Sequence, residues 1–312
     1  TMKITLLGAT GFVGRVLLAR LAQEGHQLTV LSRNPHAHLV RLLPPGTRVV
    51  TGDVYDPEVL RANFAGADAV INLVGILNEA GDNGRGFHRA HVALTKLVVA
   101  ACQLAGTKRL LQMSSLNAGR GDSFYLKTRG EAEAAVKASG LDWTIFEPSV
   151  IFGIGDGFFC RFAELLKLSP VLPLAKAGTR FAPVYIGDVV EAMRRALHSR
   201  ATVGQVYELY GADVMTLGDL VRLTARQLGL KRVVLPLPDA LARLQAFAFD
   251  FVPGKPFSSD NYRSLKLDSV GAIDGLHQLG IEPTRIGQQL ATILGSPAEK
   301  QPRYDRYRSV AR

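Results

Sequence analysis

Three polar side chains in the middle of the chain have the types and the spacing for proton transfer. Tyr125 and Arg129 are four residues apart in a run with helical periodicity, and Ser115 precedes Tyr125 by ten residues. On a helix such a pair shares one face, whereas Lys127 would point away. A cation beside a phenol favours the phenolate and permits proton transfer to or from a substrate oxygen, which Ser115 could hydrogen-bond. These residues are therefore the candidate catalytic groups, with ordinary helix packing as the alternative.

A glycine-rich turn near the start of the chain has the spacing of a phosphate-binding loop. Gly8, Gly11 and Gly14 follow the β-type run 3–7 and precede apolar residues at helical spacing. Gly8 would permit a tight turn, Gly11 would let the backbone approach phosphates, and Gly14 would let the helix pack on the strand. Because a helix N-terminus offers N–H donors and positive potential, the turn predicts a dinucleotide site.

The end of the next predicted strand indicates which dinucleotide is bound. Proteins that prefer NAD usually place an acid there, about 20 residues past the glycines, to bind the ribose hydroxyls. This chain instead has Ser32 and Arg33, followed by Asn34 and Pro35. Ser32 and Arg33 could hold a 2′-phosphate through charge-assisted hydrogen bonds, which favours NADP(H) and leaves NAD(H) as the second choice. The alternative for Arg33 is a solvated position in a loop.

Further candidate cofactor contacts follow the other predicted strands. The Asp53 carboxylate could accept a hydrogen bond from the adenine amino group, and a helix-cap or turn role for it is nearly as plausible. Gly75 could let the backbone pass close to the cofactor, or it could serve the turn alone. We assign the following residues to the cofactor site as well: Val54, Leu73, Val74 and Met113.

Residues 2–150 alternate short β-type runs with helical runs, which is typical of an α/β fold with a doubly wound parallel sheet of the Rossmann type. Strands are expected over 3–7, 28–32, 48–52, 69–73, 109–113 and 143–146. In such a sheet the carboxyl ends of the strands line one crevice, where ligands bind. The candidate residues named above should therefore lie together.

Past residue 150 the pattern changes, and we expect a smaller cap or substrate region over 151–294. Part of 181–210 should return to the first domain, and a basic tail should follow over 295–312.

Several elements of this second half are also predicted. A helix is expected over 158–168 and a strand over 181–186. Asp188 is predicted to cap a helix that runs to residue 198, and Thr216 with Asp219 is predicted to cap a helix over 217–228.

The segment 238–251 is markedly apolar and predicts an amphipathic helix. Core packing is one interpretation of its apolar residues. Docking on a membrane or on a partner protein is the other, because Asp239, Arg243 and Asp250 could mark a polar face.

Composition narrows the class of partner. Lys and Arg number 37 against 27 Asp and Glu in 312 residues, a net charge of +10. This charge favours an acidic ligand, an anionic membrane surface or an acidic protein partner. Nucleic acid is not expected as a partner, because the chain has no basic stripe with interleaved aromatic residues. The basic tail is expected to be mobile or bound to a partner.

Cysteine content and hydropathy indicate the cellular compartment that we expect for the protein. Cys102 and Cys160 form neither a disulfide framework nor a metal cluster, so no metal site is expected and a reducing cytoplasm is the default. Neither thiol has catalytic surroundings in the sequence. We expect no signal peptide before the first strand and no membrane span, because no run of about 18 uncharged apolar residues is present.

These residues resemble the short-chain dehydrogenase/reductase superfamily, in its atypical, extended branch with a Gly-x-x-Gly-x-x-Gly turn. The segments 115–118, 125–127, 147–153 and 183–189, together with 279–281 and Thr284, are similar to the nucleotide-binding accessory subunit of respiratory complex I and its bacterial relatives. The similarity spans about residues 2–294, and the set of motifs is more specific than the glycines alone.

The resemblance implies a Rossmann-type domain with a small C-terminal cap and tightly held NADP(H). The superfamily's Tyr-x-x-x-Lys has become Tyr125-x-x-x-Arg129, which keeps the cation but replaces the compact ammonium by a planar fork. The resemblance also implies further roles for particular residues: Gly8, Thr10, Gly11, Phe12 and Val13 in the phosphate loop, Arg33 at the 2′-phosphate, Asp53 at the adenine, Tyr125 as the catalytic tyrosine, and Pro148 to Ile151 beside the nicotinamide.

Two functions follow as expectations. The first is an NADP(H)-binding protein whose cofactor is structural or turns over slowly. Its cap would meet a respiratory-complex partner or an anionic membrane surface, so that a cytoplasmic protein could sit at the inner face of the cell membrane. The second is an active NAD(P)-dependent reductase or nucleotide-sugar epimerase or dehydratase, which acts on a small carbonyl or quinone-like substrate with Tyr125 as acid and base. A redox-sensing regulator that binds dinucleotide and a protein partner is a third, less favoured alternative.

Overall fold

A parallel sheet organises the chain, whose computed structural model describes residues 1–33 and 43–295. Within these residues, seven parallel strands follow the order β11-β6-β5-β4-β1-β2-β3. The strands are β1 (Lys3–Leu7), β2 (Gln27–Ser32), β3 (Arg48–Thr51), β4 (Ala69–Asn72), β5 (Arg109–Met113), β6 (Asp142–Pro148) and β11 (Gln205–Leu209). The predicted doubly wound sheet is therefore confirmed. Strand β1 pairs with both β2 and β4, so the order reverses beside the glycine turn, where such sheets bind ligands.

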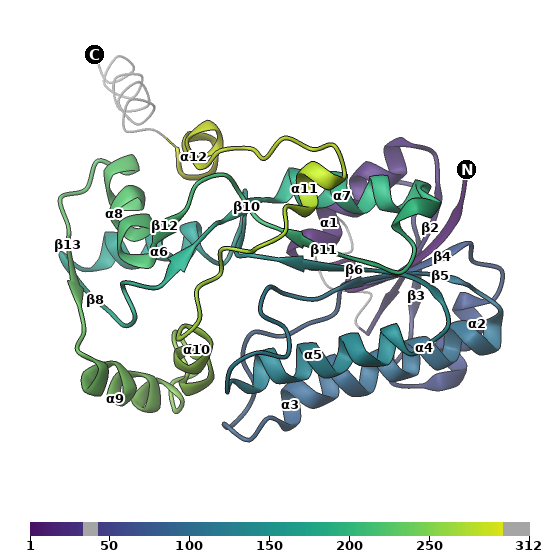
Figure 1. Cartoon of the computed structure of the whole chain (residues 1–312), viewed down its shortest axis with the longest axis horizontal. Coiled ribbons are helices and arrows are strands. Elements are labelled where there is room, and N and C mark those ends of the chain that lie inside the picture. Colours follow the sequence, from purple (N-terminus) through teal and green to yellow (C-terminus); the bar gives the residue numbers. More distant parts are fainter. Residues whose placement is uncertain (34–42, 296–312) are drawn as a thin grey trace, which may run out of the picture.

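Helices cover both faces of this sheet (Figure 1). One layer contains α1 (Phe12–Gln23) and α7 (Ile186–His198), and the other contains α2 (Pro57–Phe64), α4 (Leu94–Ala105) and α5 (Phe124–Lys137). The short α3 (Arg85–Phe87) and a π-helical turn, η2 (His88–Ala93), lead into α4. Strand β11 and helix α7 come from the second half of the chain, and both join the first sheet and its helical layer.

Burial of both sheet faces explains why the strands are continuously apolar. Leu6 and Leu7 are neighbours on β1 and therefore point to opposite faces, yet each has an exposed fraction of 0%. Leu6 packs in the core beneath α1 and α7, whereas Leu7 packs in the core beneath α2 and α4. Complete burial of one such side chain stabilises the fold by about 1.5–3 kcal/mol. The glycine turn that follows β1 is thus carried on a strand fixed from both sides.

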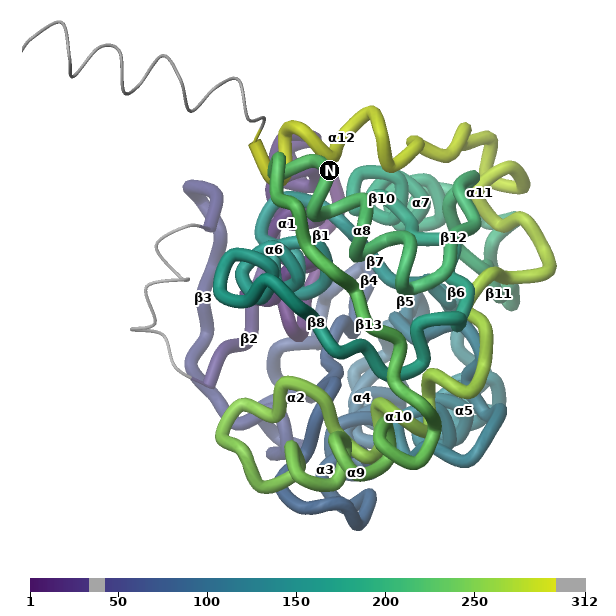
Figure 2. Tube along the Cα trace, turned by 90° about the vertical axis from the view of Figure 1, so that its left-hand side faces the viewer, coloured from purple at the N-terminus to yellow at the C-terminus, as the bar shows by residue number. Residues whose placement is uncertain are grey.

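The remaining elements form a smaller lobe, with a core of its own at the left of Figure 1. Its helices are α6 (Phe159–Leu168), α8 (Leu217–Gln227), α9 (Asp239–Phe249), α10 (Ser259–Ser264) and α12 (Ile286–Leu294), while α11 (Gly275–Gln278) packs near β11 and a 3-10 turn, η3 (Arg200–Thr202), follows α7. Its strand pairs are β8 (Val171–Leu174) with β13 (Val233–Pro236), β7 (Ile151–Phe152) with β10 (Val184–Tyr185), and β9 (Arg180–Phe181) with β12 (Met215–Thr216). Figure 2 shows β8 and β13 side by side above α9 and α10.

Two local predictions are wrong. The strand expected over 181–186 is two short strands, β9 and β10, because Pro183 interrupts the run. Asp188 does not cap α7: the helix begins at Ile186, and the Asp188 carboxylate instead accepts hydrogen bonds from the Thr284 amide (2.7 Å) and hydroxyl (2.9 Å). A distant loop therefore satisfies the carboxylate that local spacing assigned to a helix end.

The predictions for α8 and for the segment 238–251 are confirmed. Thr216 caps α8, since its hydroxyl accepts from the Asp219 amide at 3.1 Å, and the apolar segment 238–251 contains α9. No helix among the described residues is both long and apolar enough to cross a membrane. The predictions for Asn34, Pro35 and the tail from residue 296 lie outside the described residues.

Candidate functional site

The candidate residues lie along one edge of the central sheet, at the carboxyl ends of its strands. This arrangement is what the predicted crevice requires. From one side of the sheet to the other, the edge carries Pro148 at the end of β6 with Ile151 on β7, Met113 at the end of β5 with Ser115 just past it, Leu73, Val74 and Gly75 after β4, Gly8 to Gly14 after β1, Ser32 and Arg33 at the end of β2, and Asp53 and Val54 after β3.

The glycine turn has the geometry of a phosphate cradle. Gly8 has a φ of +79°, and a Cβ there would lie 3.0 Å from the Leu73 carbonyl carbon. A Cβ on Gly14 would overlap the Gly8 carbonyl oxygen and the Ala9 backbone. Helix α1 begins at Phe12, and no side chain of the described residues caps its N-terminus. The N–H groups of its first turn therefore face the edge where a pyrophosphate would bind.

Helix α5 places Tyr125 and Arg129 together, as the i, i+4 spacing predicts. The hydroxyl of Ser123 begins the helix by accepting from the Leu126 amide at 3.2 Å. The Arg129 guanidinium carbon lies 5.4 Å from the centre of the Tyr125 ring, while Lys127 is exposed on the other face. Tyr125 and Arg129 therefore share one face of the helix, and Lys127 points away from it.

The guanidinium of Arg129 is held in place by contacts with the protein backbone, which its residue type alone does not predict. Its side chain is buried, and one terminal nitrogen, Nη1, donates to the Met113 carbonyl oxygen at 3.1 Å. The other terminal nitrogen, Nη2, packs so closely on Gly75 that a Cβ there would overlap it. A side chain at position 75 would therefore displace the guanidinium from its present place. Arg129 thus hydrogen-bonds the end of β5 and packs on the loop after β4.

Two buried polar atoms at this edge have no hydrogen-bond partner among the described residues: the Ser115 hydroxyl oxygen and Arg129 Nε. Buried polar groups are nearly always paired, and each unpaired one costs about 1–3 kcal/mol. Both atoms lie where the sequence places a nicotinamide and its substrate. Together with the glycine cradle, they fit a bound dinucleotide.

His91 is a site residue that the sequence did not indicate. Its Nε2 accepts from the Ile76 amide (3.2 Å), and its Nδ1 bonds the Thr128 hydroxyl (2.9 Å). Burial, followed by the charge of Arg129, lowers the pKa of His91 to about 2, so the ring is neutral. The imidazole stands edge-on to Tyr125, with 5.5 Å between ring centres. It joins the loop after β4 to the helix that carries Tyr125.

Asp260 ties the smaller lobe to the same helix. From α10, its carboxylate accepts from the amides of Phe124 (2.7 Å) and Tyr125 (3.0 Å), which are first-turn N–H groups of α5. The contact joins residues 136 and 135 positions apart, so no local pattern could have predicted it. Tyr125 is thus positioned by both lobes.

A carboxyl pair lies behind the turn that carries Ser115. Glu133 accepts from the Ser114 hydroxyl at 2.5 Å and from the Lys137 ammonium at 3.0 Å. Desolvation, followed by the nearby Glu133 carboxylate, raises the pKa of Glu147 to about 8. Glu147 therefore carries a proton at neutral pH and can donate it to Glu133.

The outer part of the edge holds Arg33, Asp53 and Val54. Arg33 is exposed directly after β2. The Asp53 carboxylate accepts from the Tyr55 amide at 3.0 Å, so the turn role left open by the sequence is present. Val54 is 8% exposed and packs in the core, which leaves only its backbone for a cofactor contact.

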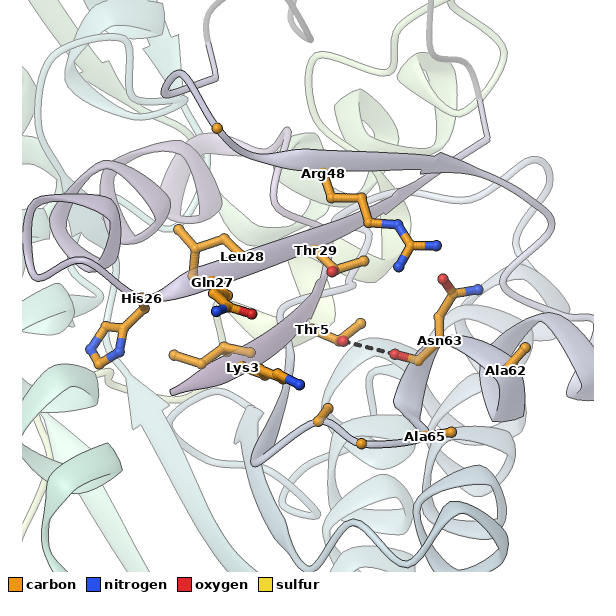
Figure 3. A pocket seen from close by; sticks show the side chains of 14 residues that line it. Lys3, Thr5, His26, Gln27, Leu28, Thr29, Arg48, Ala62, Asn63 and Ala65 are labelled. Carbon is orange, nitrogen blue, oxygen red and sulfur yellow. Dashed lines mark hydrogen bonds between the residues drawn. The ribbon is translucent and has the colours of Figure 1, made fainter. Parts of the chain in front are cut away.

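A polar hollow of about 480 Å³ lies at the opposite edge of the sheet (Figure 3). Lys3, Gln27 and Arg48 line it, and each begins one of the strands β1, β2 and β3. It contains none of the predicted site residues. Its place at the amino ends of the strands separates it from the cofactor edge.

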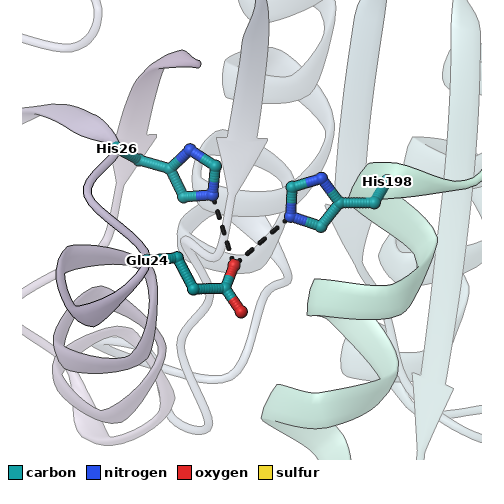
Figure 4. A group of neighbouring side chains, drawn as sticks. All are labelled: Glu24, His26 and His198. Atoms are coloured by element: carbon teal, nitrogen blue, oxygen red, sulfur yellow. Dashed lines mark hydrogen bonds and ion pairs between the residues drawn. The ribbon is translucent and has the colours of Figure 1, made fainter. Parts of the chain in front are cut away.

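Glu24, His26 and His198 form a second cluster remote from the site (Figure 4). Nε2 of each imidazole lies 3.3 Å from the same Glu24 oxygen, a grouping that could suit a metal ion. However, His26 Nδ1 accepts from the Met2 amide at 3.1 Å, so the neutral ring carries its proton on Nε2. That nitrogen is then a donor to Glu24 rather than a metal ligand, and the cluster fastens the C-terminal ends of α1 and α7.

Neither cysteine has the surroundings of a reactive thiol. Burial raises the pKa of the Cys102 thiol to about 12, and burial also raises that of Cys160. A low pKa and an electropositive setting are what reactive cysteines need. Both thiols are free in the structure.

The parallel sheet, its reversal beside β1 and the glycine cradle define an NAD(P)-binding protein of the Rossmann type. Residues 8–152 match the family of NAD(P)H-binding domains. The chain belongs to the family that contains NADH dehydrogenase [ubiquinone] 1 alpha subcomplex subunit 9.

Individual relatives support this assignment. The chain is 32% identical to NADH dehydrogenase [ubiquinone] 1 alpha subcomplex subunit 9 of Arabidopsis thaliana over 277 residues, which cover 86% of this chain and 69% of the relative. It is 31% identical to a ceramide reductase of Caulobacter vibrioides over 240 residues, which cover 76% and 74% of the two chains.

Solved structures agree on the fold. MoeE5 in complex with UDP-glucose and NAD superposes with a TM-score of 0.75 at 19% identity, covering 94% of this chain and 97% of the other. A dTDP-glucose 4,6-dehydratase of Streptomyces venezuelae superposes with a TM-score of 0.74 at 17% identity, covering 94% and 96%. At these identities the likeness concerns the fold alone.

Proposed function

We propose that this protein binds NADP(H) at the carboxyl edge of β1, β2 and β4, and that the bound cofactor is structural or turns over slowly. The observation that carries the proposal is the position of Arg129. Its Nη1 donates to the Met113 carbonyl oxygen and the guanidinium packs against Gly75, so the cation four residues after Tyr125 is held against the backbone. Its Nε is buried without a hydrogen-bond partner among the described residues.

The bound dinucleotide would contribute to stability by mass action. Cofactor at 1,000 times its dissociation constant stabilises the native state by about 4 kcal/mol. Several relatives are named as subunits of respiratory complex I, which supports a role in an assembly for this chain as well. We expect the smaller lobe to make that contact, with a partner protein or a membrane surface at the inner face of the cell membrane.

A direct test follows the oxidation of bound NADPH in the presence of quinones, aldehydes and nucleotide sugars. The wild-type protein and Tyr125→Phe should both bind NADPH, and both should oxidise it at the same slow rate. Lys127→Ala serves as a control on the exposed face of the same helix. Rapid oxidation that Tyr125→Phe abolishes would overturn the structural role and establish an enzyme.

The unpaired Ser115 hydroxyl favours a second candidate, an active carbonyl reductase. Two relatives carry reductase names, a ceramide reductase and a 2-alkyl-3-oxoalkanoate reductase. The cofactor, when bound, would supply a hydride to the carbonyl carbon. Tyr125 would give its phenolic proton to the carbonyl oxygen, Ser115 would donate a hydrogen bond to that oxygen, and a proton from solvent would restore the phenol. The Tyr125→Phe comparison distinguishes the two candidates.

A further inference from the structure

Helix α9 exposes its large apolar side chains and buries small ones. It buries two alanines, Ala242 at 0% and Ala246 at 1% exposure. Its outward face carries the large apolar side chains instead: Leu241 (51%), Leu244 (62%) and Phe247 (59%). A surface helix normally buries its large apolar residues and exposes polar ones. The outward face of α9 is therefore a candidate interaction surface.

The apolar face extends past the end of the helix. Phe251 is 76% exposed and packs edge-to-face on Phe247, with 5.3 Å between ring centres. Val233 (59%) and Leu235 (50%) are exposed on β13, the strand that leads into α9, while Val234 between them is buried. Strand β13 and α9 lie at the same end of the molecule in both views (Figures 1 and 2). Clusters of exposed apolar residues of this kind mark interaction surfaces.

The charge around α9 selects the kind of partner. Residues 231–267 contain six basic and three acidic residues, and two of the basic ones, Arg263 and Lys266, pair with Asp82 and Asp122 from elsewhere in the chain. Lys231 and Arg232 precede β13, and Arg243 is exposed on α9 itself, where it pairs with Asp239 at 3.0 Å. Basic side chains beside an apolar helical face suit the interface of a membrane with anionic headgroups.

The internal contacts of α9 fix it to the site rather than leave it as a loose appendage. Ser259 of α10 bonds Asp250 at the end of α9 through its amide (3.1 Å) and its hydroxyl (2.6 Å). The next residue, Asp260, caps the helix that carries Tyr125. A surface that binds the α9 face would therefore be connected, through α10, to the end of α5.

We propose that the outward face of α9 docks this protein on an anionic phospholipid bilayer. Leu241, Leu244, Phe247 and Phe251 would enter the interfacial region, and the neighbouring basic side chains would meet the headgroups. This inference rests on the proposed function, in which the smaller lobe contacts a partner protein or a membrane surface. It specifies that the partner is a lipid membrane. The proposed docking on lipid does not depend on whether the bound cofactor is turned over.

Vesicle flotation of the full chain tests the proposal. The wild-type protein should bind vesicles of three parts phosphatidylcholine to one part phosphatidylglycerol at least tenfold more strongly than vesicles of phosphatidylcholine alone. The double substitution Leu244→Asp with Phe247→Asp should weaken that binding at least tenfold. Leu104→Asp is the matched control, because Leu104 is 73% exposed on α4 and lies outside the proposed surface.

NADPH affinity and thermal stability are measured for every variant, so that loss of the cofactor site or of the fold is separated from loss of docking. Absence of wild-type binding to the anionic vesicles would overturn the proposal, as would equal weakening by Leu104→Asp. Gel filtration supplies a further check. A wild-type dimer that the double substitution dissociates, without any vesicle binding, would assign the face to a second copy of the chain.

Discussion

At the scale of single residues, Arg129 explains most of what distinguishes this site. A lysine would place one compact charge near the phenol, whereas the planar guanidinium reaches two backbone segments at once. The motif Tyr-x-x-x-Arg predicted that the cation is kept and shares a face with Tyr125. The partners of the cation, Met113 and Gly75, depend on how far β4 and β5 lie apart, which spacing along the chain does not encode.

Arg33→Asp tests the predicted preference for NADP(H). A charge-assisted hydrogen bond contributes about 1.5–3 kcal/mol, so loss of the 2′-phosphate contact should weaken NADPH binding by roughly 10- to 100-fold. NADH lacks that phosphate, and its affinity should change far less. Arg48→Asp is the control, because Arg48 lines the hollow at the opposite edge. Equal losses for both cofactors in a binding titration would refute the assignment of Arg33.

Gly14→Ala tests the close packing of the glycine turn. A Cβ at this position would overlap backbone atoms of Gly8 and Ala9, which cannot move without shifting the turn. Overpacking of this kind costs about 1–3 kcal/mol, and we expect that loss in urea unfolding together with weaker NADPH binding. Gly157→Ala should be neutral, since a Cβ there meets nothing within 4 Å. An undiminished affinity in Gly14→Ala would contradict the cradle geometry.

At the scale of elements, strand periodicity and glycine turns predicted the sheet well, because parallel strands buried on both faces leave a strong apolar signal. The roles of other residues could not be predicted, because their hydrogen-bond partners lie far away in the sequence. Asp188 was predicted to cap a helix and instead bonds Thr284, and no local pattern singled out His91, which joins the loop after β4 to α5. Periodicity also found α9, but only the packed structure shows which of its faces is buried.

The pair of Glu147 and Glu133 joins β6 to α5 and predicts a pH dependence. The pKa of Glu147 is about 8 in the fold against 4.5 for the ordinary group. Between these values the unfolded chain has released the proton and the native state still holds it, so stability falls as pH rises through this window. The slope should reach up to about 1.4 kcal/mol per pH unit for one proton, and Glu147→Gln should remove it.

Urea unfolding between pH 5 and 9 measures this dependence. Glu131→Gln is the control, because Glu131 lies exposed on the same helix as Glu133. A slope in Glu147→Gln equal to that of the wild type would show that Glu147 does not hold the proton.

At the scale of the whole molecule, both lobes act on one helix. The sheet supplies the Met113 carbonyl that Arg129 of α5 bonds, and the smaller lobe supplies Asp260 at the start of α5. We expect Asp260→Asn to weaken NADPH binding and to lower the stability of the smaller lobe, since the first-turn amides of α5 lose a charged acceptor worth about 1.5–3 kcal/mol. Hydrogen exchange should then show faster exchange at Phe124 and Tyr125, whereas unchanged protection there would contradict the coupling.

The most direct test of the account is the identity of the dinucleotide that remains on the protein after gentle purification, read by mass spectrometry together with its rate of release. The account predicts near-stoichiometric NADP(H) that leaves slowly and is lost in Arg33→Asp. Recovery of NAD(H), or of a protein free of dinucleotide that gains no stability on addition of NADPH, would contradict it.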